Sequence, residues 1–335
     1  MPEDFEEVLE LLTYLWGTEK SNRERFIWKH HKNPFGKKPV GAVAKHDGKI
    51  IGFWGFIPVE WRIGNEILMM LNACDTVVHP EHRGKGLYFE LLKQAMRDYG
   101  DEYRFFVSFT PNAMTSRLGL KTGWKPISTQ EYLRHISFLN LAINKLSRRD
   151  KVSLEPGDFG EVIVSDTILA ADISRISMAN TYLANKICPN RTPGFLEWTH
   201  SNPISKHTYL YHQSESGIDA YLILRTSRIH AYIFDFGYEQ DSLGVQKLIS
   251  FVLKHGKFGS VSLLNAAATE ELNPFLKSKH FHTFSRINRI RNRELENLLT
   301  FVRPTVENAS EDDWFINGLD VRETDNWHIT EICFD

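Results

Sequence analysis

The feature that most limits how this chain can fold is a junction between residues 76 and 99. It begins with the β-branched run Thr76–Val78, passes through Arg83–Gly86 (Arg-Gly-Lys-Gly), and continues as an amphipathic stretch, Leu87–Tyr99. β-Branched residues favour a strand, apolar residues at helical spacing favour a helix, and glycines permit a sharp turn between them. We therefore expect a strand, a tight turn and a helix in succession.

The turn has the composition of an anion-binding site. The first N–H groups of a helix have no partner within the helix, and the helix dipole is positive at that end. Glycine lets a phosphate approach the backbone closely because no Cβ intervenes. Arg83 and Lys85 add two cations to this turn. A diphosphate is the ligand that fits.

Three phosphate-binding motifs can be compared with this turn. A P-loop needs lysine and then Ser or Thr after its second glycine, whereas Lys85 precedes Gly86 and no Ser or Thr follows. A dinucleotide fingerprint would require its third glycine at Phe89. The remaining pattern, Arg-x-x-Gly-x-Gly/Ala, is met by Arg83 and Gly86, with Tyr88 at its last position.

Together with the preceding Val77–Pro80 and the helix that follows, this pattern resembles the acetyl-CoA-binding motif of the GNAT superfamily of N-acyltransferases. The resemblance implies acetyl-CoA as co-substrate and a binding site made mainly by the main chain. It implies that the strand before the turn faces the acyl carbonyl and pantetheine, that the turn surrounds the pyrophosphate, and that Asn112 contacts the pantetheine arm. An asparagine that caps the helix after it is an equally simple reading of Asn112. The expected cofactor-binding residues are Thr76, Val77, Val78, Arg83, Gly84, Lys85, Gly86, Leu87, Tyr88 and Asn112.

The order of the expected elements in the first half fits the same superfamily. Hydrophobic periodicity and turn residues predict the following ranges: helices at 2–16, 21–32, 87–99 and 113–122, and strands at 40–45, 50–56, 68–78, 105–109 and most of 124–139. Asp47-Gly48 predicts a hairpin turn between the first two strands. The expected fold class is α+β, with mixed, mostly antiparallel sheets flanked by helices.

An internal repeat predicts two copies of this fold. Residues 26–34 read FIWKHHKNP, and residues 195–203, which lie 169 positions later, read FLEWTHSNP. Between them, residues 144–160 are polar, basic and contain Pro and Gly, as a linker would. We expect a GNAT acyltransferase domain at 1–145, a linker at 146–159 and a degenerate GNAT-like domain at 160–335.

The second half lacks the glycine-rich turn. At the corresponding place residues 234–254 read FDFGYEQDSLGVQKLISFVLK, with Gly244 near the expected helix start and Glu239 and Asp241 ahead of it. Carboxylates would repel a diphosphate, so we expect one CoA site per chain, in the first half. The basic run formed by Arg286, Arg289, Arg291 and Arg293 either meets an anionic acceptor or is a solvated surface.

Acyl transfer to an amine needs a proton acceptor, and the sequence offers several candidates near the expected acyl site. They are Asp75, Asn72, His79 and Glu60. We choose Asp75 as the catalytic residue, because a carboxylate next to the acyl site can take a proton through water. A strand carboxylate that pairs with a surface cation explains Asp75 equally well.

The group that protonates the departing thiolate is not apparent. Many GNAT enzymes have a tyrosine four residues before a Gly-Phe pair, which this chain writes as Gly123-Trp124, and that position is Gly119 here. No tyrosine lies between Tyr103 and Tyr132. Either another group or water protonates CoA, or this half binds CoA without fast catalysis.

Composition limits the partners. A net charge of −2 and a pI of about 6.7 provide no overall basic field, so neither nucleic acid nor an anionic membrane is an expected partner. Three widely spaced cysteines and the isolated pair His280-x-His282 predict neither disulfides nor a metal site. The acidic start MPEDFEEVLELL and the absence of a long uncharged apolar run predict a cytoplasmic protein.

The expected function is transfer of an acetyl or short acyl group from CoA to the amine of a small molecule, an amino sugar or a peptide. One alternative is a catalytically weak module that binds acyl-CoA. Another is a Fem-like aminoacyltransferase, since those enzymes are also tandem GNAT-like proteins. They use aminoacyl-tRNA and do not depend on an Arg-Gly-Lys-Gly turn, and the near-neutral charge of this chain argues against tRNA. The oligomeric state is not predicted.

Overall fold

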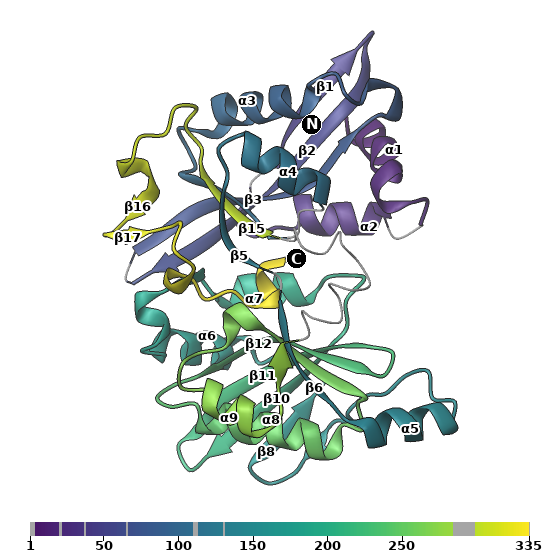
Figure 1. Cartoon of the computed structure of the whole chain (residues 1–335), viewed down its shortest axis with the longest axis vertical. Coiled ribbons are helices and arrows are strands. Elements are labelled where there is room, and N and C mark those ends of the chain that lie inside the picture. Colours follow the sequence, from purple (N-terminus) through teal and green to yellow (C-terminus); the bar gives the residue numbers. More distant parts are fainter. Residues whose placement is uncertain are drawn as a thin grey trace. The chain divides into compact units, whose positions relative to one another are not determined.

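The computed structural model describes residues 4–19, 22–36, 38–64, 66–109, 113–129, 131–283 and 299–334, with only the backbone of Ala113, Thr129 and Leu299. The chain forms two compact units (Figure 1). Unit 1 comprises Met1–Ser128, Ser201–Ile204 and Asn297–Asn326, and unit 2 comprises Thr129–His200, Ser205–Glu296 and Trp327–Asp335. The domain limits expected from the sequence, 1–145 and 160–335, stay a prediction.

Unit 1 is built on a mixed sheet. Its strand order is β1-β2-β3-β4-β15-β5. The strands are β1 (Val40–His46), β2 (Lys49–Ile63), β3 (Glu66–Val78), β4 (Phe105–Ser108), β5 (Lys125–Thr129) and β15 (Leu299–Pro304), and a hairpin adds β16 (Phe315–Ile316) and β17 (Leu319–Asp320). The helices are α1 (Phe5–Trp16), α2 (Asn22–Phe26), α3 (Leu87–Tyr99) and α4 (Ala113–Lys121), with a π-helical turn, η1 (Ile27–His31), and a 3₁₀ turn, η2 (Pro80–His82).

The first three strands form an antiparallel meander. The hairpin between β1 and β2 turns at Asp47 and Gly48, whose φ angles of 50° and 80° are those of a two-residue turn. The predicted hairpin is therefore confirmed. β3 and β4 run parallel and are joined by α3, but they pair only at Leu71 with Phe106 and Asn72 with Val107.

Alternation along β2 fixes which helix covers which face of the sheet. Trp54 packs with Leu91 of α3, whereas Phe53 packs with Val8 and Leu12 of α1. Successive strand residues point to opposite faces. Helix α3 therefore covers one face and α1 the other, so the strand-turn-helix junction lies at the end of a well-packed sheet.

The prediction that most of 124–139 is strand is confirmed, and the segment forms two strands that belong to different sheets. Residues 125–129 form β5 of unit 1, whereas β6 (Tyr132–Ile136) pairs with β13 (Ser260–Leu264) in the sheet of unit 2. β15, from near the end of the chain, pairs with β4 of unit 1. Each sheet is thus completed by a strand that is distant in sequence, and such pairing leaves no local signal.

Unit 2 repeats the arrangement of meander, helix and parallel strand. β10 (His207–Ser214), β11 (Gly217–Ser227) and β12 (His230–Tyr238) are antiparallel, and α8 (Leu243–His255) leads to β13, which runs parallel to β12. The strand order is β14-β6-β13-β12-β11-β10-β8-β7. The remaining elements are β7 (Gly157–Asp158), β8 (Val162–Ser165), β9 (Ile187–Pro189), β14 (His282–Thr283), α5 (Phe138–Leu146), α6 (Ala170–Ala179), α7 (Pro193–His200) and α9 (Asn273–Ser278).

The repeated Asn-Pro segments form the same local turn. Asn33 accepts a hydrogen bond from the N–H of Phe35 at 2.8 Å, and Asn202 accepts one from the N–H of Ile204 at 3.1 Å. Both asparagines are buried. The matching turns are consistent with a duplication, which stays a proposal.

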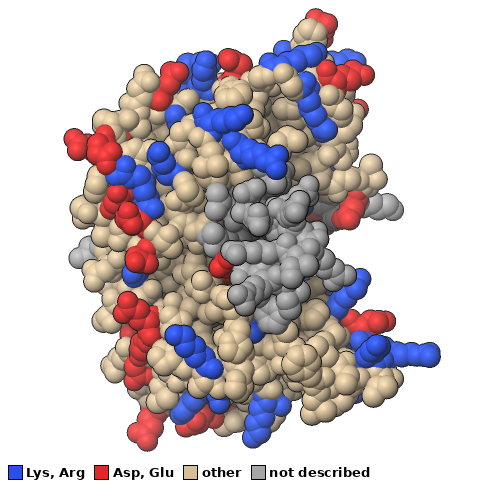
Figure 2. Space-filling view, in the orientation of Figure 1, with Lys and Arg blue, Asp and Glu red and all other residues tan. Residues whose placement is uncertain are grey.

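The fold class expected from the sequence is confirmed, since both units are mixed sheets flanked by helices (Figure 1). Among the residues that the structure describes, no helix is both long and apolar enough to cross a membrane. Acidic and basic side chains alternate over the face seen in Figure 2.

Candidate active site

The turn between β3 and α3 is shaped by its two glycines. Gly84 and Gly86 have φ angles of 75° and 80°, a conformation that L side chains rarely adopt. A Cβ built on either glycine would have no atom within 4 Å, so the space above both is open. Arg83 closes the turn, because its Nε donates to the carbonyl oxygen of Val78 at 3.1 Å.

This turn exposes a row of unpaired donors. Among the described residues, the N–H groups from Gly84 to Tyr88 have no hydrogen-bond acceptor, and the first backbone bond of the helix runs from Phe89 to the carbonyl of Gly86 at 2.9 Å. Neither Arg83 nor Lys85 pairs with a described carboxylate. Free donors, two cations and a helix dipole together make a positive, open concavity.

The expected pyrophosphate residues are thus brought together, but not all by their side chains. The ring of Tyr88 is buried and stacks on Trp54 with centroids 4.9 Å apart. Burial raises the pKa of its hydroxyl to about 12. Only the main chain of Tyr88 is therefore available to a ligand at the turn.

Thr76, Val77 and Val78 form the last part of β3. They pair with Trp54, Phe53 and Gly52 of β2 on one side. On the other side β4 pairs no further along β3 than Asn72. The described structure therefore leaves the second edge of this strand segment without a strand partner, so its backbone groups can serve a ligand. Asn112 and the four arginines between 286 and 293 lie outside the described residues.

Asp75 occupies a β-bulge in β3. Gly55 pairs with Cys74 and Trp54 with Thr76, so Asp75 is the extra residue, with a φ angle of 47°. Its carboxylate accepts hydrogen bonds from Lys29 Nζ at 3.1 and 3.3 Å. Bulges and non-glycine residues with positive φ occur often beside active sites.

The Lys29–Asp75 pair is buried and charged. Burial alone would raise the pKa of Asp75, but the Lys29 ammonium and the neighbouring His30 outweigh burial and hold it well below its usual value. Burial likewise opposes the charge of Lys29, yet the carboxylate of Asp75 raises the pKa of the lysine. Both groups are therefore ionised at neutral pH.

A neutral imidazole and a neutral thiol complete this cluster. His30 Nε2 lies 3.5 Å from Asp75 Oδ2, and neither ring nitrogen has a hydrogen-bond partner. Burial lowers the pKa of His30, and burial followed by the charge of Asp75 raises the pKa of Cys74 well above its usual value. The donor atoms of His30, Cys74 and Asp75 lie within 4.8 Å of one another, a donor set that suits zinc, but the Lys29 ammonium opposes a second cation there.

The other base candidates differ in their surroundings. Glu60 pairs with Met69, which is about 20 Å along β3 from Asp75 at roughly 3.3 Å per residue. His79 Nε2 lies 3.3 Å from the hydroxyl of Tyr14, and Asn72 is buried. Asp75 lies among the titratable groups of Lys29, His30 and Cys74. Gly119, at the expected tyrosine position, packs against Trp124.

In unit 2, carboxylates of the chain itself accept hydrogen bonds from N–H groups at the corresponding helix start, that of α8. Asp241 Oδ1 accepts from the N–H of Leu243 at 2.8 Å, and Glu271 Oε1 accepts from the N–H of Ser242 at 2.9 Å. Gly244 serves packing, because a Cβ there would lie 2.6 Å from the Cβ of Ala220. Two donors at the start of α8 are therefore capped by carboxylates, whereas the donors of the turn in unit 1 are free.

Unit 2 also has a buried carboxylate, Asp235, in β12, but hydrogen-bond donors already surround this carboxylate. Asp235 accepts two bonds from Arg191 at 2.8 Å, one from Tyr221 at 3.0 Å and one from Thr330 at 2.7 Å. Its side chain and that of Arg191 are fully buried. The carboxylate of Asp235 accepts four side-chain hydrogen bonds, which indicates a structural role. Among the described residues, the carboxylate of Asp75 accepts hydrogen bonds from Lys29 alone and can accept more.

Residues 1–126 match the family model of the GNAT acetyltransferase domain. The first part of the chain is therefore similar to GNAT acetyltransferase domains. Such a domain is an acyltransferase, so the enzyme class expected from the sequence is confirmed. No curated protein sequence matches the chain.

Solved structures resemble nearly the whole chain. A conserved protein from Enterococcus faecalis V583, described as a probable N-acyltransferase, has a TM-score of 0.66 and 15% identity over 90% of this chain and 70% of its own. A GCN5-related N-acetyltransferase from Anabaena variabilis has a TM-score of 0.64 and 14% identity, over 91% and 71%. Eis1 from Mycobacterium abscessus has a TM-score of 0.55 and 14% identity, over 91% and 72%. At these identities the likeness shows the fold alone.

Lys29 and His30 are the site residues that sequence reasoning missed. Both belong to the FIWKHHKNP segment. That segment was singled out because it is repeated, and its residues were not considered as catalytic groups. Lys29 is 46 positions from Asp75 in the chain, so their contact has no local signature. The position of Lys29 directly after the apolar and aromatic residues 26–28 is the one hint that could have singled it out.

Proposed function

We propose that this chain is an N-acyltransferase that moves an acetyl or short acyl group from CoA to the amine of a small molecule, a sugar or a peptide. The observation that carries the proposal is the row of free N–H groups from Gly84 to Tyr88 beneath two open glycines. A diphosphate satisfies such a row directly. The GNAT match over residues 1–126 supports CoA as the donor of the acyl group.

The residues present fit CoA by their chemistry. In the proposal the main chain from Arg83 to Tyr88 holds the pyrophosphate, and the Arg83 and Lys85 side chains add charge. The unpaired edge of Thr76–Val78 offers backbone donors and acceptors to the pantetheine and to the acyl carbonyl. Asn112 stays a proposed contact to the pantetheine arm.

In the reaction a neutral amine attacks the thioester carbonyl, the C–S bond breaks, and the amine proton must leave. We keep Asp75 as the proposed proton acceptor, acting through water, because it is ionised and lies on β3 directly before the expected acyl site. Its low pKa means that it passes the proton on and does not retain it. With Gly119 at the expected tyrosine position, water is the proposed acid for the CoA thiolate.

Unit 2 is proposed to be a degenerate GNAT-like copy that does not bind CoA. The same order of meander, helix and parallel strand supports the kinship. The capping of its helix start by Asp241 and Glu271 supports the loss of the phosphate site.

Calorimetric titration with CoA tests the donor site. Gly86→Val should place a branched side chain in the open space above the turn, so CoA affinity should fall at least tenfold while the fold survives. Gly160→Val is the matched control, because Gly160 has a φ of 81°, has open space around its Cβ position, and lies in unit 2. Unchanged CoA affinity in Gly86→Val would refute the proposed site.

A second assay separates the enzyme from its alternatives. Release of CoA thiol from acetyl-CoA that depends on an added amine, above the rate without amine, identifies a transferase. CoA binding without release for any acyl-CoA and any amine would favour the acyl-CoA-binding module. Transfer from aminoacyl-tRNA, with no CoA binding, would favour the Fem-like reading.

A further inference from the structure

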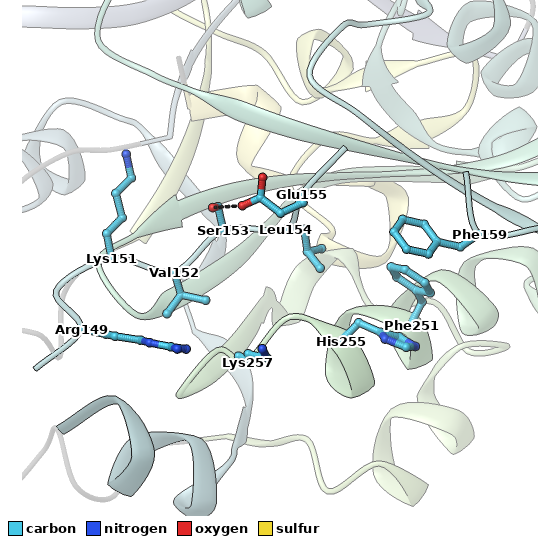
Figure 3. Close-up of a pocket in the computed structure, with 10 residues that line it drawn as sticks. All are labelled: Arg149, Lys151, Val152, Ser153, Leu154, Glu155, Phe159, Phe251, His255 and Lys257. Atoms are coloured by element: carbon cyan, nitrogen blue, oxygen red, sulfur yellow. Dashed lines mark hydrogen bonds between the residues drawn. The ribbon is translucent and has the colours of Figure 1, made fainter. Parts of the chain in front are cut away.

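Unit 2 contains a pocket that the proposed acyl transfer does not use. It has a volume of about 480 Å³, within the usual size range of small-molecule sites. Its lining residues are Arg149, Lys151, Val152, Ser153, Leu154, Glu155, Phe159, Phe251, His255 and Lys257 (Figure 3). Seven of these ten residues, from Arg149 to Phe159, come from the segment that the sequence presents as a linker.

That segment is fixed to unit 2 at the pocket. The side chains of Val152 and Leu154 are buried, and the N–H of Val152 donates to the carbonyl of Arg228 at 3.0 Å. This wall of the pocket is therefore an extended segment that packs on unit 2, and it is not a flexible linker.

One buried asparagine is hydrogen-bonded to two of the three cationic residues of the pocket, Arg149 and Lys257. The carbonyl of Asn144 accepts from the N–H of Arg149 at 2.9 Å, and its side-chain amide donates to the carbonyl of Lys257 at 3.0 Å. Asn144 is 2% exposed. In Figure 3 the Arg149 side chain extends toward Lys257, whereas Lys151 points away from both.

These cations are not neutralised. Neither Arg149 nor Lys257 forms an ion pair with any carboxylate in the described parts of the chain. Glu155 is the one acidic residue of the lining, and its carboxylate accepts from the hydroxyl of Ser153 at 3.4 Å. The Arg149 end of the pocket is thus positive and has open hydrogen-bond donors.

The opposite end of the pocket is aromatic. The rings of Phe159 and Phe251 lie 5.1 Å apart, and those of Phe251 and His255 are stacked at 4.5 Å (Figure 3). Phe159 is 52% exposed, which is unusual for a phenylalanine that packs against another ring. Exposed aromatic faces of this kind bind planar rings.

We propose that this pocket binds a small ligand that carries a phosphate on a planar ring. Arg149 and Lys257 hold the phosphate, and Phe159, Phe251 and His255 receive the ring. The site is separate from the CoA turn, so it gives unit 2 a ligand of its own.

Phenyl phosphate, inorganic phosphate and phenol are the probes, each titrated by calorimetry or by ligand-observed NMR into the whole chain. Phenyl phosphate should bind about tenfold more tightly than inorganic phosphate or phenol, since ring stacking and charge act together. The same titrations in the Gly86→Val chain should give the same result, because the CoA turn is not involved.

Variants locate the site. Arg149→Ser and Lys257→Asn should each weaken phenyl phosphate about tenfold, and asparagine is chosen because Lys257 has a φ of 48°. Phe159→Ala should remove the preference for phenyl phosphate over phosphate. Lys277→Ser, which removes an exposed cation of α9 in the same unit, should change nothing.

Three outcomes would overturn the proposal. The first is equal affinity for phenyl phosphate and inorganic phosphate in the unmodified chain. The second is an equal loss of binding in Lys277→Ser and Arg149→Ser. The third is loss of phenyl phosphate binding in Gly86→Val, which would assign the probe to the CoA turn. Circular dichroism of each variant confirms that its fold is intact.

Discussion

Lys29 Nζ lies 3.1 Å from Asp75 Oδ2, and the two side chains are only 8% and 5% exposed. The π-helical turn η1 supplies the cation, and a β-bulge supplies the anion. A buried pair of this kind adds little net stability, but removal of one partner strands a charge away from water. The pair therefore stabilises the bulge at Asp75, which follows the last residue of β3 that pairs with β4.

Lys29→Met should destabilise the chain by about 3 kcal/mol, because it leaves the Asp75 carboxylate buried without its cation. The double variant Lys29→Met with Asp75→Asn should recover much of that loss. Lys247→Met is the control, since the Lys247–Glu161 pair is exposed and should contribute less than about 1 kcal/mol. Denaturant unfolding measures all four chains, and equal losses for Lys29→Met and Lys247→Met would contradict the account.

Asp75→Asn should slow acyl transfer by about 100-fold because it removes the proposed proton acceptor. It should also lower the stability, because Lys29 stays buried without its anion, but CoA should still bind because the phosphate turn is unchanged. Asparagine tolerates the positive φ of this position. Asp47→Asn is a matched control, an exposed aspartate with a φ of 50° in the same unit. An unchanged rate in Asp75→Asn would exclude the proposed role.

The stability of unit 2 should fall with acid because of its buried histidines, which include His200, His207 and His328. Burial lowers the pKa of His200 to about 4 and that of His207 to about 3. The unfolded chain, with a histidine pKa of about 6.5, binds more protons below that pH, so protons favour unfolding. As the pH falls from 6.5 to its folded pKa, each histidine should lower the free energy of unfolding by about 1.4 kcal/mol per pH unit. Above pH 6.5 none of these histidines should change the free energy of unfolding.

His207→Gln should flatten this pH dependence, whereas His46→Gln, at an exposed position of β1, should not. Chemical denaturation at half-unit pH intervals gives the slope. A slope in His207→Gln as steep as in the unmodified chain would show that other groups control the acid sensitivity.

A methyl group should mainly reduce stability at the helix start of unit 2 and mainly reduce CoA affinity at the helix start of unit 1. Gly244→Ala places its Cβ 2.6 Å from that of Ala220, so it should lower the stability by about 1–3 kcal/mol. Gly86→Ala meets no atom and should cost only about 1 kcal/mol for its positive φ, while it weakens CoA. Thermal unfolding and CoA titration compare them, and a larger destabilisation in Gly86→Ala would contradict this assignment of roles.

The phosphate turn could be predicted from the sequence because its conformational demands act on residue type. A backbone with φ angles near 75–80° at positions 84 and 86 requires glycine, and an anion favours Arg and Lys beside it. The β1–β2 hairpin was predictable for the same reason, through Asp47-Gly48. Local backbone geometry of this kind can be predicted because it depends on the types of neighbouring residues.

Non-local contacts could not be predicted in this way. Whether β6 joins the sheet of unit 1 or unit 2 depends on which partner strand is free, and both candidate strands have suitable apolar patterns. Lys29 reads as a solvated helix cation until the fold brings it to Asp75. The capping of α8 by Glu271, which is 29 residues away, is likewise hidden.

Backbone amide NMR of the whole chain during a CoA titration tests the central claim most directly. The account predicts that the amide signals of Gly84, Lys85, Gly86, Leu87 and Tyr88 shift together and saturate at one CoA per chain, while those of Ser242, Leu243 and Gly244 stay in place. Shifts at the start of α8, or saturation at two CoA per chain, would contradict it, and so would CoA binding that leaves the amides from Gly84 to Tyr88 unmoved.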